Sequence, residues 1–111
     1  MRLRTEEGLD FWCTPLNKYR YNLNDDDSTN VITISLDDEL YVVGVWTDSN
    51  ICKCKARNFV GKYKIPVKVI LAKNQCGEIQ YQDQYEYTYE FYMKWKIKSK
   101  RLQLEREMLN N

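Results

Sequence analysis

Apolar and aromatic side chains alternate with polar ones from Tyr85 to Ile97, and Tyr92 is the one aromatic residue on the polar side. A period of two residues predicts a strand with one buried face, and aromatic side chains favour the pleated surface of a sheet. On a helix, the same apolar residues would fall on every side and leave no single face to pack. We therefore predict one long strand over 85–97, around which the rest of the sheet is arranged.

Six further segments have patterns typical of strands. They lie at about 18–23, 30–36, 40–47, 51–56, 62–72 and 78–82. Segment 40–47 is a continuous apolar run, which predicts a strand buried on both faces. Gly44 within it indicates a bulge or the close approach of another backbone. Polar stretches, such as the acidic residues 25–27, predict the intervening turns, because short polar side chains bond their own backbone.

The period changes after Ile97. Leu102, Leu104 and Met108 fall within one arc of a helix and are surrounded by good helix formers. A short C-terminal helix is therefore predicted at about 99–109. The fold class expected for the whole chain is mainly β (α+β), with a small antiparallel sheet or a partly open barrel of about six or seven strands, of OB-like or SH3-like type.

Length and charge restrict the class of protein. A chain of 111 residues is the size of one domain, so a single domain over 1–111 is expected. The 17 basic and 16 acidic residues nearly cancel, so no global field demands nucleic acid or a membrane. The N-terminus has no apolar core of a signal peptide, and no apolar run is long enough to span a bilayer. We therefore expect a cytoplasmic protein.

The residue types argue against most catalysis. The chain has no histidine, which excludes Ser-His-Asp triads, Cys-His pairs and zincin motifs. The cysteines are Cys13, Cys52, Cys54 and Cys76. Their spacing is not that of paired metal knuckles, so we expect buried free thiols, with a zinc site or disulfides as alternatives. No catalytic residue, metal site or cofactor is predicted. Asp, Glu, Lys or Tyr chemistry in an assembled pocket stays open.

A basic run follows the acidic part of the long alternating stretch. It comprises Lys94, Lys96, Lys98, Lys100 and Arg101, with no acidic residue between them. Together with Tyr92, which we expect to be exposed, these residues are the predicted partner-binding surface. The three lysines of segment 62–72 are Lys62, Lys64 and Lys68. They are expected either to pair with acidic residues across the sheet or to remain unpaired.

The function that these patterns favour is that of a non-enzymatic protein-binding module. It would be a small inhibitor or adaptor of the kind encoded by viruses or mobile elements, and its partner would be another protein. One alternative is a nucleic-acid-binding barrel that uses Lys62, Lys64, Lys68, Tyr92, Lys94 and Lys96. The near-zero net charge counts against it. A second alternative is a self-associating structural subunit, such as a homodimer, because a strand as long as 85–97 invites pairing with a second chain.

Overall fold

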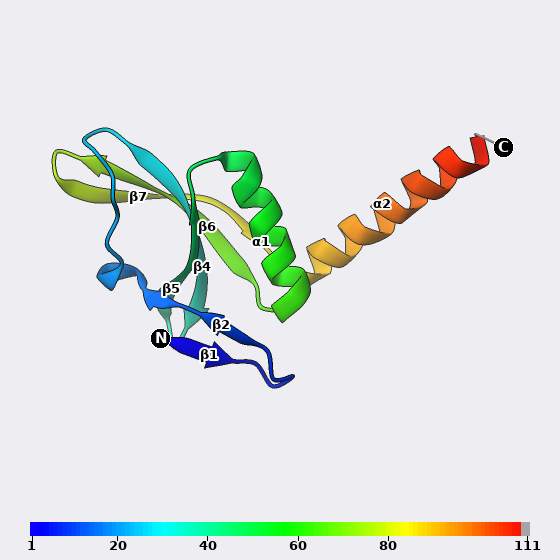
Figure 1. Cartoon of the computed structure of the whole chain (residues 1–111), viewed down its shortest axis with the longest axis horizontal. Helices are drawn as coiled ribbons and strands as arrows, with labels where there is room; N and C mark the ends of the chain where they lie inside the picture. The colour runs from blue at the N-terminus through cyan, green and yellow to red at the C-terminus, as the bar shows by residue number, and fades with distance from the viewer. Residues whose placement is uncertain (110–111) are drawn as a thin grey trace.

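The computed structural model describes residues 1–109, which form two antiparallel sheets and two long helices (Figure 1). The strands are β1 (Arg2–Arg4), β2 (Asp10–Trp12), β3 (Thr14–Pro15), β4 (Ser28–Leu36), β5 (Glu39–Trp46), β6 (Val67–Gln75) and β7 (Glu78–Tyr87). The helices are α1 (Ser49–Tyr63), α2 (Tyr89–Leu109) and a short 3₁₀ turn, η1 (Leu16–Lys18).

The main sheet has five strands in the order β3-β5-β4-β6-β7, and β1 pairs with β2 in a separate hairpin. Two tight hairpins, β4–β5 and β6–β7, form most of the main sheet. Asp37 and Asp38 turn β4 into β5 with φ values of 51° and 66°, and Cys76 and Gly77 turn β6 into β7 with 54° and 86°. Two consecutive residues with positive φ are typical of type I′ turns, whose twist matches that of antiparallel strands.

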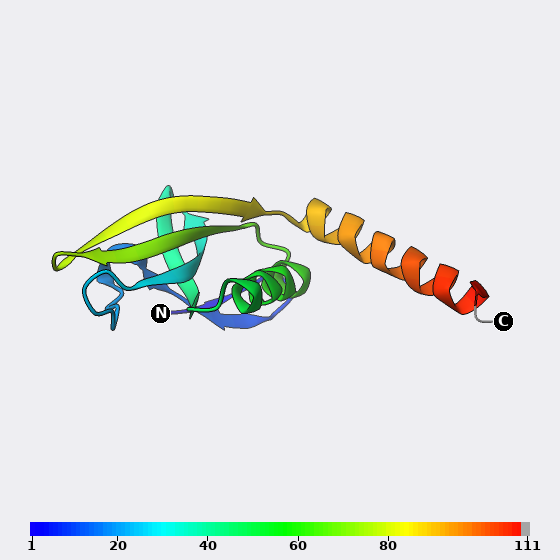
Figure 2. The same ribbon diagram turned by 90° about the horizontal axis from the view of Figure 1, so that it is seen from above.

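Each face of the main sheet is covered by a different part of the chain. Helix α1 lies beneath one face, where Cys52, Ala56 and Val60 pack on apolar residues of β4 and β6 (Figure 2). On the opposite face, a second cluster formed around Val31 and Ile70 is covered by side chains from the segment 16–21. The β1–β2 hairpin packs on α1 through Phe11, whose ring contacts those of Phe59 and Tyr63.

The structure confirms the predicted fold class. It is mainly β, with seven strands, an open antiparallel sheet that does not close into a barrel, and a C-terminal helix. Strands β4 and β5 match the predicted segments 30–36 and 40–47, and the register shifts beside Gly44, as its position in the run indicated. The predicted helix at 99–109 forms the second half of α2.

Two predicted strands are wrong. Residues 18–23 form the end of η1 and an irregular segment that covers the sheet, and residues 51–56 lie in α1. The apolar residues of α1 recur at helical spacing, and the Asp48 carboxylate caps the helix by accepting a hydrogen bond from the Ile51 N–H at 2.9 Å. The predicted strand at 62–72 starts five residues later, at Val67, because α1 continues to Tyr63.

The predicted long strand at 85–97 is also wrong beyond Tyr87. Val67, the first residue of β6, pairs with Tyr87, so β7 has no partner strand after this point. Pro66 precedes β6 and lacks the N–H that a continued ladder would need. Helix α2 begins at Tyr89 instead and satisfies its backbone groups internally, with the Thr88 hydroxyl accepting from the Phe91 N–H at 3.2 Å.

Candidate functional site

The four cysteines differ in burial. Cys13 and Cys52 are buried, and burial raises the pKa of both thiols, so they stay protonated at neutral pH. Cys54 and Cys76 are exposed, which corrects the prediction that all four would be buried. All four are free thiols, and residues 1–109 hold no group of three side chains that could bind a metal ion.

The first two turns of α2 are anchored on α1. The ring of Tyr92 lies over Gly61, where an added Cβ would come within 2.5 Å of Cζ of the tyrosine. The Tyr89 ring stacks on that of Tyr92, with centroids 6.0 Å apart. The guanidinium of Arg57 lies 4.0 Å from the centre of the Trp95 ring, a cation–π contact. These contacts fix the direction in which the rest of the helix leaves the body.

Beyond Trp95 the helix projects from the body without touching it (Figures 1 and 2). We call residues 96–109 the free segment. Every residue from 96 to 108 is exposed, and among them are Ile97 at 55%, Leu102 at 52%, Leu104 at 59% and Met108 at 77%. Isolated helices shorter than about 12–15 residues are only marginally stable in water. The free segment is not isolated, because it continues the anchored first turns of α2, but it gains no stability from packing on the body.

The exposed apolar residues of α2 form two stripes on different sides of the helix. At about 3.6 residues per turn, the first stripe contains Phe91, Trp95 and Leu102. The second stripe contains Met93, Ile97, Leu104 and Met108. The direction that faces α1 continues with Ser99 and Gln103, both polar. Beyond the contact with α1, the side of α2 that continues this direction is therefore polar, and the apolar side chains lie on two other sides of the helix.

The structure places all six predicted partner-binding residues on α2, although Tyr92, Lys94 and Lys96 were predicted to lie on a strand. Tyr92 is half-buried in the contact with α1, so it anchors the helix instead of standing exposed. The other five residues are exposed and point in several directions around the helix; they are Lys94, Lys96, Lys98, Lys100 and Arg101. With Glu90, Glu105, Arg106 and Glu107, they give α2 six basic and three acidic residues, a net charge of +3.

The lysines named for the nucleic-acid alternative do not share a face of the sheet. Lys62 lies on α1, and Lys64 ends that helix in a left-handed conformation with its ammonium 3.0 Å from Glu7. The Glu7 carboxylate raises the pKa of Lys64. Lys68 lies opposite Glu86 in the sheet and pairs with Asp83 at 3.1 Å. Two of these three lysines are thus paired within the chain, and the three do not form one continuous basic face.

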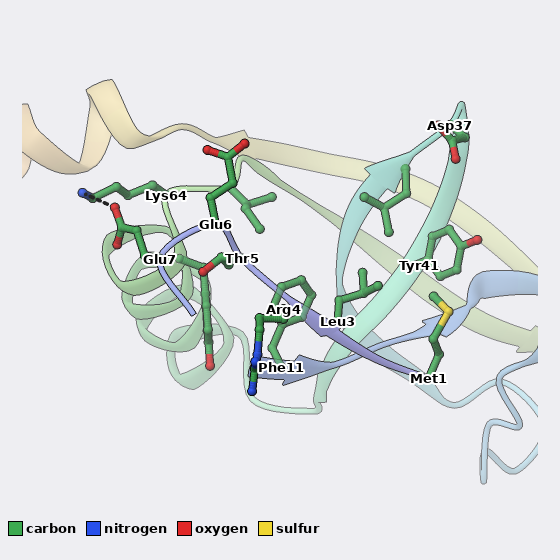
Figure 3. Close-up of a pocket in the computed structure, with 13 residues that line it drawn as sticks. Met1, Leu3, Arg4, Thr5, Glu6, Glu7, Phe11, Asp37, Tyr41 and Lys64 are labelled. Carbon is green, nitrogen blue, oxygen red and sulfur yellow. Dashed lines mark hydrogen bonds and ion pairs between the residues drawn. The ribbon is translucent and has the colours of Figure 1, made fainter. Parts of the chain in front are cut away.

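A cleft of about 750 Å³ opens between the β1–β2 hairpin, the β4–β5 turn and the end of α1 (Figure 3). Its apolar floor is formed by Leu3, Phe11, Leu36, Tyr41, Tyr63 and Ile65. The charged residues at its rim are Arg4, Glu6, Glu7, Asp37 and Lys64. Figure 3 shows that Glu7 pairs with Lys64, and Arg4 pairs with Asp10 at 3.0 Å. Within residues 1–109, Glu6 and Asp37 form no ion pair, so the rim carries two free carboxylates.

Sequence reasoning found the basic side chains of this surface but missed its apolar ones. The stripe residues between 91 and 97 were assigned to the buried face of a strand because alternation predicted one, whereas Leu102, Leu104 and Met108 were predicted on one arc of a short helix. Thr88 before the run and Glu90 in its first turn are signals of a helix start that were available. The cleft has no such signal, because its lining comes from four separate segments that only the fold brings together.

No protein-family model matches this sequence, and neither a curated protein nor a solved structure matches it. Within residues 1–109, neither helix combines the length and the apolar character that crossing a membrane requires.

Proposed function

We propose that this chain is a non-enzymatic protein-binding module that uses the free segment of α2 to dock on another protein. The single observation that carries the proposal is the exposure of four large apolar side chains on the part of the helix that leaves its own body, namely Ile97, Leu102, Leu104 and Met108 at 52–77%. Exposed apolar side chains gathered on one element mark an interaction site, and an amphipathic helix in a groove is a common mode of protein recognition.

The charge of α2 defines the kind of groove. Five basic residues between 94 and 101 surround the apolar stripes, so the complementary surface has an apolar floor and an acidic rim. Because the stripes lie on different sides of the helix, a groove that contacts the helix on two sides covers more of them than a flat surface would. The basic residues would speed the encounter and set its salt dependence, while burial of the apolar residues would supply most of the affinity.

The proposal is tested by capture from extracts of the native host. The bait is the full chain or its Leu102→Glu, Leu104→Glu variant. A matched control carries Gln80→Glu and Gln82→Glu on the exposed strand β7, which adds the same charge away from the helix. We expect proteins that bind the wild type and the control and are lost from the helix variant, and each should then bind the chain as a purified protein. The proposal is wrong if the helix variant retains every protein that the wild type captures.

A salt series on the purified pair measures the role of the basic run. Reversing Lys98→Glu and Arg101→Glu should weaken binding by about tenfold or more at low salt and by less at high salt, because screening shortens the reach of exposed charges. Equal loss at both salt concentrations would contradict an acidic rim on the partner.

A further inference from the structure

The free segment of α2 and the cleft beside Tyr41 are complementary surfaces on the same chain, and we propose that the free segment of one copy occupies the cleft of a second copy. This inference rests on the function proposed above, because it names one groove that the helix fills. The occupant of the cleft is then the α2 helix of an identical chain, and the complex is a dimer with reciprocal contacts.

The chemistry of the two surfaces matches. The cleft has an apolar floor, which includes Leu3, Phe11 and Leu36, and it is open on one side. Its free rim carboxylates, Glu6 and Asp37, come from two separate elements, the β1–β2 turn and the β4–β5 turn (Figure 3). The free segment brings apolar side chains with lysines beside them. Seating a stripe on the floor would remove apolar surface of both copies from water and place basic groups near the two carboxylates.

The size of the cleft suits a segment of helix. A volume of about 750 Å³ accepts several side chains but not a folded domain. The 14 residues of the free segment, at a rise of about 1.5 Å each, extend roughly 21 Å from the body. This length is enough to cross a cleft of a neighbouring molecule and to present more than one apolar residue to it.

The helix cannot reach the cleft of its own chain. Tyr92 over Gly61 and Trp95 against Arg57 fix its first turns, and the remaining turns point away from the body (Figure 1). However, α2 starts beside the cleft, because the ammonium of Lys64, which lines the rim, lies 5.8 Å from the centre of the Tyr89 ring. In the proposed dimer a two-fold axis relates the two copies. Each helix then lies over the cleft of the other copy, because the contacts of an isologous dimer are reciprocal.

Reciprocal contacts also explain the second apolar stripe. With the two-fold axis perpendicular to α2, the two helices run antiparallel, so one stripe faces the cleft and the other is free to face the neighbouring helix. Antiparallel helices set the basic run 94–101 of one copy alongside Glu105 and Glu107 of the other, which is favourable. Parallel helices would place the two basic runs together. Two equal contacts double the area that one contact would bury.

The first experiment measures mass by light scattering during size exclusion, at loading concentrations from about 1 µM to about 200 µM. The wild type should reach twice the 13.4 kDa of one chain as concentration rises. Leu102→Glu with Leu104→Glu should raise the dissociation constant more than about 100-fold, since two buried apolar side chains are replaced by charges. These positions lie outside the body, so circular dichroism should show an unchanged fold.

A rim variant tests the cleft itself. Glu6→Lys with Asp37→Asn removes both free carboxylates, and asparagine tolerates the positive φ of 51° at position 37. We expect this variant to dimerise about tenfold more weakly. The control is Glu78→Lys with Gln80→Lys, which adds the same three positive charges on the exposed strand β7 and should dimerise as the wild type does.

The second experiment uses disulfide cross-linking to show which surfaces meet. All chains carry Cys54→Ser and Cys76→Ser, which remove the two exposed native thiols. Chains with Leu104→Cys are mixed either with Glu6→Cys chains or with Gln80→Cys chains as a background. Cross-linking to position 6 should exceed the background at least about tenfold. Cross-linking at the level of the background overturns the placement of the helix in the cleft.

The outcomes separate this inference from the function on which it rests. A monomer at every concentration overturns the dimer, while the helix-dependent capture from extracts can still stand. A dimer that the rim variant leaves intact also overturns the occupied cleft, because the helices would then pair with each other. Loss of dimerisation in the rim variant together with cross-linking to position 6 supports the inference.

Discussion

The two long helices of this protein use their apolar residues in opposite ways. In α1, Cys52, Ala56 and Val60 recur on one face and are completely buried against the sheet. In α2, apolar residues occur on several sides, and Ile97, Leu102, Leu104 and Met108 of the free segment are 52–77% exposed. A helix with one apolar face completes a core, whereas a helix with two stripes and no cover is suited to contacts with other molecules. The contrast separates the part of the chain that determines stability from the part that we propose for binding.

The largest expected effect compares one buried and one exposed position. Val60→Asp places an unpaired charge at a fully buried site of α1 and should lower the free energy of unfolding by about 3–5 kcal/mol. At concentrations where the chain is monomeric, Leu102→Asp on the free segment should change it by no more than about 0.5 kcal/mol. Urea unfolding followed by circular dichroism measures both. Similar losses in the two variants would show that the free segment belongs to the core.

The contact between the two helices can be tested at Gly61. A methyl group there would come within 2.5 Å of the Tyr92 ring, so Gly61→Ala should destabilise the protein by about 1–2 kcal/mol. In a Tyr92→Ala background the ring is gone, and the same change should stabilise by about 0.8–1.0 kcal/mol, because alanine is the better helix former. The reversal of sign, measured as a double-mutant cycle, is the signature of the contact. Equal effects in both backgrounds would argue that Tyr92 does not anchor α2 on α1.

The pH dependence of stability should come from the body and not from the free segment. Burial, with a further contribution from Cys52, raises the pKa of Tyr85 from 10.0 to about 12. Between these two values the unfolded chain loses the phenolic proton while the folded chain keeps it, so stability should fall as pH rises from 10.0 to about 12. Tyr85→Phe should make this fall shallower, leaving the share of Tyr21 and Tyr87, whose pKa values burial also raises. An unchanged slope would assign the effect to other groups.

The smallest expected effect concerns the edge of the anchored part. Arg57→Ala removes the guanidinium that lies 4.0 Å from the Trp95 ring and should cost about 0.5–1 kcal/mol. In a background with Trp12→Phe and Trp46→Phe, emission from Trp95 should shift to longer wavelength as the ring gains water. Lys55→Ala is the matched control, because it removes a cation of α1 that lies over position 46 and not over Trp95. A shift of equal size in that control would show that the Arg57 contact does not shield Trp95.

The sequence by itself determined the elements whose pattern of apolar and polar residues fits only one kind of secondary structure. The alternation at 30–36 and the apolar run at 40–47 predicted β4 and β5. The absence of histidine restricted the chemistry. The basic run 94–101 could be predicted from the sequence, because the clustering of charged residues along the chain does not depend on its conformation.

Only the tertiary structure decided between helix and strand where both patterns were present. Apolar and polar residues alternate in both 51–56 and 85–97. The first segment nevertheless packs as a helix across the sheet, and the second extends beyond the end of its partner strand. A strand needs a neighbour to satisfy its backbone, and the neighbour of β7 begins at Val67, opposite Tyr87. Beyond that point a helix is the element that satisfies the backbone within one segment. The position of a distant strand end therefore determined the conformation of α2 and exposed the stripes that we propose as its binding surface.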